Sequence, residues 1–409
     1  MSSRQGRPGP VTVAVVSATV LAGTAALAAI AATALSAVMA RRIVTPPTKR
    51  EQDTRVHAVD LAAGTITLQT TADSVLRGDY SFWFSEDTGH ARVGEIVLST
   101  ADGVTRRLVA VDFGNLEGAR LGRLGGYTYL GPEGLGFPFE NVMVPTSLGD
   151  APAWLIPAAE PSGRWVIQVH GRAVQRPETL RAVPVFRDAG YTSLLVSYRN
   201  DGEAPASADG RYGLGDTEWL DVEAAITFAR ARGATSIVLM GWSMGGAISL
   251  HTVSRTEHSD ILAGVVLDSP VIDWADVVAF HGGALGLPTP IITGAMRVLG
   301  RRWGGLLTGQ ASPIDFRRLD VVARAGELTV PILLMHSDDD GYVPAAGSRA
   351  LALRRPDLVT FVPFTTARHT KLWNYDREGW NLAITRWLGE LETSAHTSLP
   401  HHPPAAGEG

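Results

Sequence analysis

The stretch Ser236-Ile-Val-Leu-Met-Gly-Trp-Ser-Met-Gly-Gly-Ala-Ile-Ser-Leu250 decides the fold of this chain. It opens with an apolar run suited to a buried strand and closes with Gly246-Ala-Ile-Ser-Leu250, which can continue as a helix. Between them stands Gly241-Trp-Ser-Met-Gly245, a G-x-S-x-G pattern whose glycines permit a sharp turn around a strained central residue. The pattern predicts that the hydroxyl of Ser243 is exposed at the tip of this turn as a nucleophile, above the positive end of a helix.

Strands and helices alternate around this turn, which predicts an α/β fold with a mostly parallel sheet flanked by helices on both faces. A hairpin at 139–144 and 153–156 is expected to come first. Further strands are predicted at 165–169, 193–197, 262–267, 330–335 and 358–364, and helices at 179–189, 218–232, 345–354 and 376–391. The segment 270–329 is apolar, rich in glycine and longer than a connection requires, so we expect a cap insertion there.

A serine nucleophile needs a base to take its proton and a carboxylate to orient that base. The strand before 336 ends in His336-Ser-Asp-Asp-Asp-Gly-Tyr-Val-Pro344, from which we take Asp340 as the acid. Three other carboxylates stay open as alternatives, namely Asp338, Asp339 and Asp268. His369 follows the next strand and is the one histidine between Asp340 and the polar tail, so it is the predicted base.

The negative charge that develops on a substrate carbonyl oxygen needs two backbone N–H donors. Met244, the residue after the nucleophile, is expected to supply one. The other is expected from the loop that follows the strand ending in His170-Gly171, where the amide of Arg172 is the natural candidate. Gly171 lets the chain turn closely at that point.

These motifs resemble those of the α/β-hydrolase superfamily over about residues 136–392. The matching segments are His170-Gly-Arg172, Gly241-Trp-Ser-Met-Gly-Gly246, Asp340-Gly-Tyr-Val-Pro344 and His369. Within the superfamily the pattern is similar to monoacylglycerol lipases, serine aminopeptidases and prolyl-oligopeptidase-like enzymes. A departure is Ser337, where the family often has glycine. The resemblance implies that Tyr198 and Trp242 border the substrate pocket and that neither a metal nor an organic cofactor is required.

The N-terminal segment is apolar enough to predict a membrane anchor. Residues 1–10 are short and basic, and residues 11–40 contain no charged side chain. A helix over that run would be about 45 Å long, more than a bilayer core of about 30 Å. Arg41-Arg42 follows it like a stop-transfer flank, although A-x-A triplets keep a cleaved signal peptide open. Basic residues on both flanks leave the orientation uncertain, and we expect the catalytic domain to be extracytoplasmic.

Between this segment and the α/β domain the pattern changes twice. Residues 41–53 are expected to form a linker, and residues 54–135 show short alternating strands separated by Gly/Asp turns, which predict a small β-rich module. We expect this module to be a packing or spacer domain, or alternatively to cover the active site and limit the size of the substrate. At the other end, residues 393–409 predict a disordered tail, in which a metal-binding role for His401-His402 is the less favoured alternative.

Composition narrows the class of function. The chain has 409 residues, a net charge of −5 and no cysteine, so nucleic-acid binding, thiol catalysis and disulfides are not expected. We therefore expect a membrane-anchored serine hydrolase that cleaves carboxylic esters of acyl or lipid-like substrates. A peptidase with the same triad is the alternative, and a non-catalytic binding module at the membrane is the remote one. The oligomeric state is left open.

Overall fold

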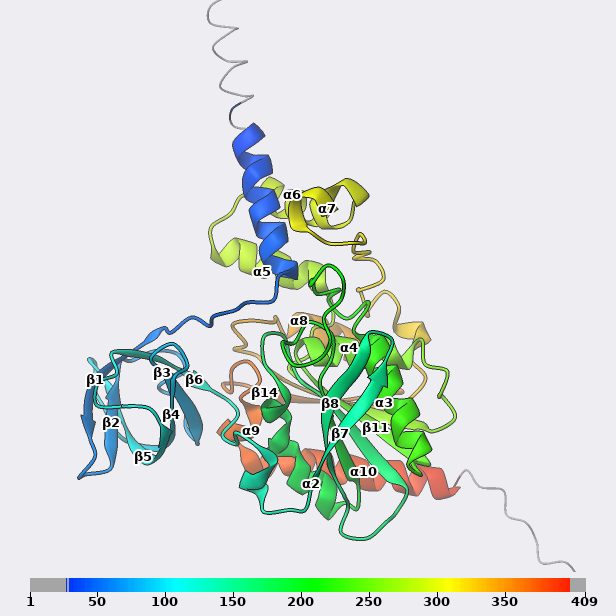
Figure 1. Ribbon diagram of the computed structural model, residues 1–409, viewed down its shortest axis with the longest axis horizontal. Coiled ribbons are helices and arrows are strands. Elements are labelled where there is room, and N and C mark those ends of the chain that lie inside the picture. Colours follow the sequence, from blue (N-terminus) through cyan, green and yellow to red (C-terminus); the bar gives the residue numbers. More distant parts are fainter. Residues whose placement is uncertain (1–26, 28, 398–409) are drawn as a thin grey trace, which may run out of the picture. The chain divides into compact units, whose positions relative to one another are not determined.

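The computed structural model describes residue 27 and residues 29–397 (Figure 1). The chain divides into two compact units, which are described separately. The smaller unit contains the described residues up to Thr45 together with Val278–Ile314. The larger unit contains Pro46–Val277 and the chain from Asp315 onward.

The larger unit begins with a closed β-barrel. Its strands are β1 (Thr54–Asp60), β2 (Thr65–Leu68), β3 (Tyr80–Phe84), β4 (Gly89–Ser99), β5 (Val104–Phe113) and β6 (Leu121–Gly125). They pair in the order β1-β2-β5-β4-β3-β6, and β1 closes the barrel by pairing with β6. Alternate side chains such as Tyr80, Phe82 and Phe84 point into its core, as the period of two along a strand requires. Closure leaves the barrel without free sheet edges.

Arg106 on β5 is buried in the barrel and holds one of its loops. Its guanidinium donates to the carbonyl oxygens of Gly94, Ser74, Leu76 and Gly78 at 2.6 to 2.9 Å. A buried charge is tolerated only when its donors are satisfied, and here four carbonyls satisfy it. The loop between β2 and β3 is therefore fixed to the barrel core.

An eight-stranded sheet forms the rest of the larger unit. After the barrel come η1 (Pro132–Leu135), β7 (Glu140–Thr146), β8 (Gly149–Ile156), β9 (Arg164–Val169), β10 (Thr192–Val196), β11 (Ser236–Trp242), β12 (Leu262–Asp268), β13 (Ile332–Ser337) and β14 (Val359–Phe364). The order across the sheet is β14-β13-β12-β11-β9-β10-β8-β7. The hairpin β7–β8 is antiparallel, β8 pairs antiparallel with β10, and the other neighbours are parallel. The predicted mostly parallel sheet is thus confirmed.

Helices cover both faces of this sheet (Figure 1). They are η2 (Arg176–Ala182), α2 (Val183–Asp188), α3 (Trp219–Ala231), α4 (Met244–Val253), η4 (Ala325–Glu327), α8 (Ala346–Arg354), α9 (Leu372–Tyr375) and α10 (Arg377–Thr397). Phe186 of α2 and Trp380 of α10 share one core cluster with strand residues such as Val238. The next strand residue, Leu239, is also buried and points to the opposite face, which α3 and α4 cover.

The smaller unit is a packed set of helices. It contains a helix over residues 29–44, the end of α5 (Trp274–Ala284), α6 (Thr289–Leu299), η3 (Arg302–Gly304) and α7 (Gly305–Thr308). Ser36 donates to the carbonyl oxygen of Ile291 at 3.0 Å. A Cβ at Gly294 would stand 2.4 Å from the hydroxyl of Ser36, so small residues bring this helix and α6 together.

The ends of the chain differ from the sequence-based boundaries. The N-terminal helix continues to residue 44, beyond the predicted end at Ala40, because arginine is a good helix former and Pro46-Pro47 comes only afterwards. In residues 27 and 29–397 no helix is both long and apolar enough to cross a membrane. The predicted span 11–40 lies largely outside the described residues, as do residues 1–10. Helix α10 runs to Thr397, past the predicted start of the tail, and 398–409 lie outside the described residues.

We predict that Arg106→Met destabilises the chain by about 3 kcal/mol or more, because the substitution leaves buried carbonyls without donors. The measurement is the free energy of unfolding in urea. Arg107→Met is the matched control, since the neighbouring Arg107 forms an exposed ion pair with Glu95 and should change stability by less than about 1 kcal/mol. Equal losses in the two variants would contradict the prediction.

Candidate active site

The strand-to-helix turn predicted from the sequence lies between β11 and α4. Ser243 has φ 51° and ψ −117°, a conformation that only glycine adopts easily. A Cβ at Gly241 would stand 2.3 Å from the carbonyl oxygen of Gly245. A Cβ at Gly245 would stand 2.1 Å from the carbonyl oxygen of Val169 and 2.5 Å from that of His170. The pattern therefore needs its glycines because the backbone is packed against itself and against the end of β9.

Ser243, His369 and Asp340 form a chain of hydrogen bonds. The hydroxyl oxygen of Ser243 lies 3.0 Å from Nε2 of His369. Nδ1 of His369 lies 2.7 Å from Oδ2 of Asp340. Since a carboxylate only accepts, Nδ1 carries the proton and Nε2 is left to accept from the hydroxyl. This is the geometry in which an imidazole can take a proton from serine.

The carboxylate of Asp340 has all its lone pairs engaged. Oδ1 accepts from the amides of Tyr342 and Val343, both at 2.8 Å. Oδ2 accepts from His369 and, at 3.1 Å, from Nε2 of His336. Burial by itself raises the pKa of Asp340, but the two imidazoles outweigh it, and the net effect holds this pKa well below its ordinary value. The residue is therefore charged at neutral pH.

The three alternative acids face other partners. Asp338 pairs with Arg349 and is exposed. Asp339 accepts from the hydroxyl of Ser337 at 2.6 Å and from the amide of Arg368 at 2.9 Å. The buried Asp268 accepts hydrogen bonds from Ser269 Oγ and Trp380 Nε1, and burial raises its pKa. Of these four carboxylates, Asp340 is the one that contacts His369.

The loop after β9 lies against the nucleophile turn. A Cβ at Gly171 would stand 3.2 Å from Cβ of Ser243. The amide of Gly171 donates to Oε2 of the buried Glu178 at 2.7 Å, so this amide is already used. The amide of the next residue, Arg172, is the candidate from this loop, and that of Met244, at the first turn of α4, is the candidate from the nucleophile side. Their role as oxyanion donors stays a prediction.

The two residues expected at the substrate pocket are buried instead. Tyr198 has no exposed surface, stacks on His170 and donates to the carbonyl oxygen of Gly171 at 2.7 Å. Trp242 has no exposed surface either and packs in the same core cluster as Trp380. The physical reason is that side chains alternate along a strand, and Trp242 shares the core face of β11 with Met240.

Sequence reasoning missed several supporting side chains. His336 bonds to Ser348 Oγ through Nδ1 at 2.7 Å and to Asp340 through Nε2. Ser337, the departure from the family pattern, accepts from the amide of Ala367 at 2.9 Å and so joins the two loops that carry Asp340 and His369. Glu178 holds the loop after β9. The sequence shows each of them only as a polar residue at or after the end of an apolar strand. Such a position does not identify the group to which the side chain is hydrogen-bonded.

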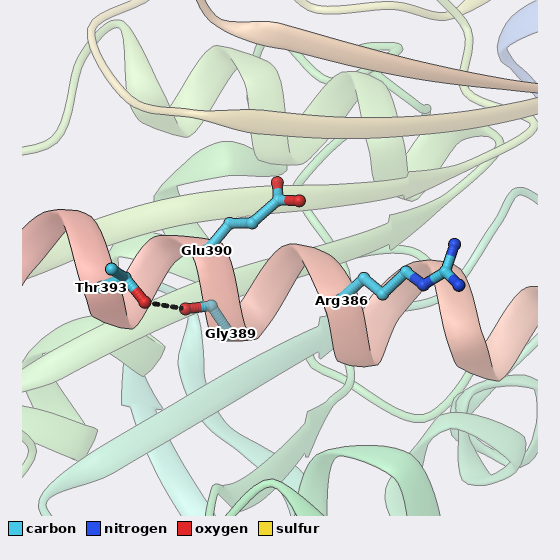
Figure 2. A pocket seen from close by; sticks show the side chains of 4 residues that line it. All are labelled: Arg386, Gly389, Glu390 and Thr393. Atoms are coloured by element: carbon cyan, nitrogen blue, oxygen red, sulfur yellow. Dashed lines mark hydrogen bonds between the residues drawn. The ribbon is translucent and has the colours of Figure 1, made fainter.

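Two surface hollows lie away from these residues. One, of about 430 Å³, lies over the exposed face of α10 and is lined by Arg386, Gly389, Glu390 and Thr393 (Figure 2). The other, of about 290 Å³, includes Trp165 and Thr192, which lie at the N-terminal ends of the parallel strands β9 and β10. Neither contains a residue of the Ser243 site. In the described part of the chain, no three His, Asp or Glu side chains gather as metal ligands, and His401-His402 lie outside it.

Comparisons with known proteins agree with the α/β fold. Residues 166–379 match the alpha/beta hydrolase family, and residues 55–125 match a domain of unknown function, DUF8805. YqkD of Bacillus subtilis (strain 168), described as uncharacterized, is 21% identical over 231 residues, which cover 56% of this chain and 72% of YqkD. The structure of the esterase Pf2001 from Pyrococcus furiosus has a TM-score of 0.50 at 19% identity, over 64% of this chain and 94% of Pf2001. The likeness to Pf2001 shows a shared fold.

We predict that the stability contributed by Asp340 is lost in acid. A carboxylate whose pKa is lowered by folding stabilises the native state above its unfolded pKa of about 3.9, and this contribution falls as pH drops toward the folded pKa. The difference in unfolding free energy between wild type and Asp340→Asn should therefore shrink between about pH 5 and pH 2. Urea titrations across this range measure it, with Asp338→Asn as the exposed control. A difference that stays constant with pH would refute the prediction.

Proposed function

The chain belongs to the alpha/beta hydrolase family and is an enzyme of the hydrolase class, and we propose that it cleaves carboxylic esters through an acyl-enzyme on Ser243. The observation that carries this proposal is the single imidazole of His369, which lies within hydrogen-bond distance of both Ser243 Oγ and Asp340 Oδ2. A second supporting observation is the strained backbone of Ser243, since strain of this kind gathers at functional residues.

In the proposed reaction, Oγ of Ser243 attacks the ester carbonyl while Nε2 of His369 takes its proton. The charge of Asp340 stabilises the imidazolium that forms, and the amides of Met244 and Arg172 stabilise the oxyanion. Collapse of this intermediate breaks the ester C–O bond, and the imidazolium returns the proton to the leaving alcohol. Water, deprotonated by His369, then attacks the acyl-enzyme and releases the carboxylic acid with Ser243 restored.

An ester is favoured over a peptide with a free amino terminus because the carboxylates beside the triad already have protein partners. Glu178 accepts from Gly171, Asp268 accepts from Trp380, and Asp339 accepts from Ser337. A substrate ammonium would have to displace these buried hydrogen bonds, which costs free energy. Pf2001, which shares the fold, is named an esterase, and this is consistent with the choice. Amide hydrolysis by the same residues is the second candidate.

We predict that Ser243→Ala lowers kcat for p-nitrophenyl esters by at least about 10⁴-fold, because the acyl-enzyme can no longer form. The same variant should lose labelling by a fluorophosphonate probe. Ser254→Ala, which changes a serine at the end of α4, is the control and should keep both. Labelling that persists in Ser243→Ala would overturn the assignment, and faster turnover of aminoacyl anilides than of acyl esters by wild type would favour the peptidase alternative.

We also propose that the smaller unit binds a membrane surface. Its described residues include no Asp or Glu and five arginines, Arg41, Arg42, Arg297, Arg301 and Arg302. Several of its large apolar side chains are exposed, among them Leu306, Leu285 and Trp303. Arginine together with exposed tryptophan and leucine suits the surface of an anionic bilayer. We further propose that the larger unit is extracytoplasmic, which an enzyme reporter fused to the C-terminus would test.

We predict that the full chain sediments with vesicles containing anionic phospholipid. Replacing Arg297, Arg301 and Arg302 together by glutamine should weaken this binding about tenfold or more, since each basic residue contributes on the order of 1 kcal/mol near such a surface. Co-sedimentation across a lipid titration is the measurement, and a triple replacement of arginines in the larger unit, Arg317, Arg324 and Arg349, is the control. Equal binding of both triple variants would count against the proposal.

A further inference from the structure

The loop that carries His369 has an unusual backbone. It connects β14 to α9, and the residues on both sides of the histidine have positive φ, 60° for Arg368 and 49° for Thr370. Neither residue is glycine, so this conformation persists only where the surroundings fix it. The question is which contacts hold the loop in place.

Residues of the α/β part of the larger unit hold this loop mainly through the main-chain atoms of the loop. The amide of Arg368 donates to Asp339 Oδ1, and the amide of Thr370 donates to Ser269 Oγ at 3.1 Å. The carbonyl oxygen of Thr370 accepts from the guanidinium of Arg181 at 2.7 Å. The guanidinium of Arg368 also donates to the carbonyl oxygen of Asp339 at 3.1 Å. The side chains of Arg368 and Lys371 share a further partner outside the sheet.

That partner is Asp73, in the barrel loop between β2 and β3. Nζ of Lys371 donates to Oδ2 of Asp73 at 2.8 Å, and Nε of Arg368 lies 3.6 Å from Oδ1. Each oxygen of one carboxylate therefore faces a cation from one side of His369. The three side chains are 12 to 29% exposed, so water screens these pairs less than it screens a pair on the open surface.

The loop segment that carries Asp73 is anchored to the barrel through the next residue. The side chain of that residue, Ser74, donates to the carbonyl oxygen of Gln69 and accepts from the amide of Thr71, both at 2.8 Å. The carbonyl of Ser74 accepts from the buried Arg106. A charge fixed in this way can impose a position on the residues that it binds.

The barrel also contacts the helix that follows the loop. A Cβ at Gly78 would stand 1.9 Å from the carbonyl oxygen of Asn374, and Nδ2 of Asn374 donates to the carbonyl oxygen of Asp79 at 2.7 Å. Nε of Arg77 donates to the carbonyl oxygen of Tyr375 at 3.2 Å. The barrel thus binds the chain on the C-terminal side of His369 through backbone contacts as well as through ion pairs.

We propose that Asp73 is a positioning residue which, from the barrel, fixes the His369 loop in the geometry needed for proton transfer. The inference rests on the proposed hydrolase function and gives the barrel, which matches a domain of unknown function, a part in the reaction. Asp73 acts through Arg368 and Lys371 and need not touch the substrate. Its loss should therefore affect turnover more than substrate binding.

The test compares Asp73→Ala, Asp73→Glu and wild type as full-length chains with p-nitrophenyl esters. We expect Asp73→Ala to lower kcat about tenfold with KM within about twofold, since small displacements of a catalytic group cost this much or more. Asp73→Glu should recover most of the loss. Glu95→Gln, in the exposed Arg107–Glu95 pair of the same barrel, is the control and should match wild type. A kcat of Asp73→Ala within twofold of wild type would overturn the proposal, as would a loss that Asp73→Glu does not reduce.

Amide hydrogen exchange gives a readout that does not depend on turnover. Peptides that contain 366–372 should exchange faster in Asp73→Ala than in wild type, while peptides from β13 should not change. Unchanged exchange at 366–372 would overturn the positioning role. Failure of wild type to hydrolyse esters or to react with a fluorophosphonate would instead count against the proposed function, so the two failures are distinguishable.

Discussion

The rest of this structure depends on a close contact between two main-chain segments, the end of β9 and the first turn of α4. The carbonyl oxygens of Val169 and His170 occupy the space in which any side chain at Gly245 would lie. The end of β9 is therefore packed directly against the first turn of α4, and the loop after His170 reaches the nucleophile turn without an intervening side chain. The spatial relation between Ser243 and the loop after β9 is set by the backbone, which varies less than side-chain rotamers do.

Asp340 is held by a different principle, because it is a charge in a buried environment that excludes most water. A buried carboxylate is costly unless hydrogen bonds replace the water that it loses. Two amides of its own loop and two imidazoles supply these bonds. One of the imidazoles, His336, is oriented in turn by Ser348. The orientation of His369 thus depends on a network that extends from β13 into α8.

The sequence could predict the parallel sheet and the meeting of Ser243, Asp340 and His369, because strand ends in one sheet lie at one edge and the glycines mark the turn. It favoured Asp340 as the acid but left Asp338, Asp339 and Asp268 open, since three adjacent aspartates follow one strand and the direction of each side chain depends on how the loop folds. The closure of the barrel was also out of reach, because it depends on the pairing of β1 with β6, which are distant in sequence. The burial of Trp242 follows from the alternation of side chains along β11, but the tertiary fold decides which face of that strand packs against helices.

The pairing of Asp73 with Lys371 also has a consequence for biosynthesis. The two residues are 298 positions apart in the chain. At a synthesis rate of about 5–20 residues per second, Lys371 follows Asp73 by about 15 to 60 s. The barrel has time to fold first, while the strand and loop that bring His369 are synthesised later. A nascent chain therefore carries Ser243 long before His369, and the hydrogen bond between them can form only after both have been synthesised.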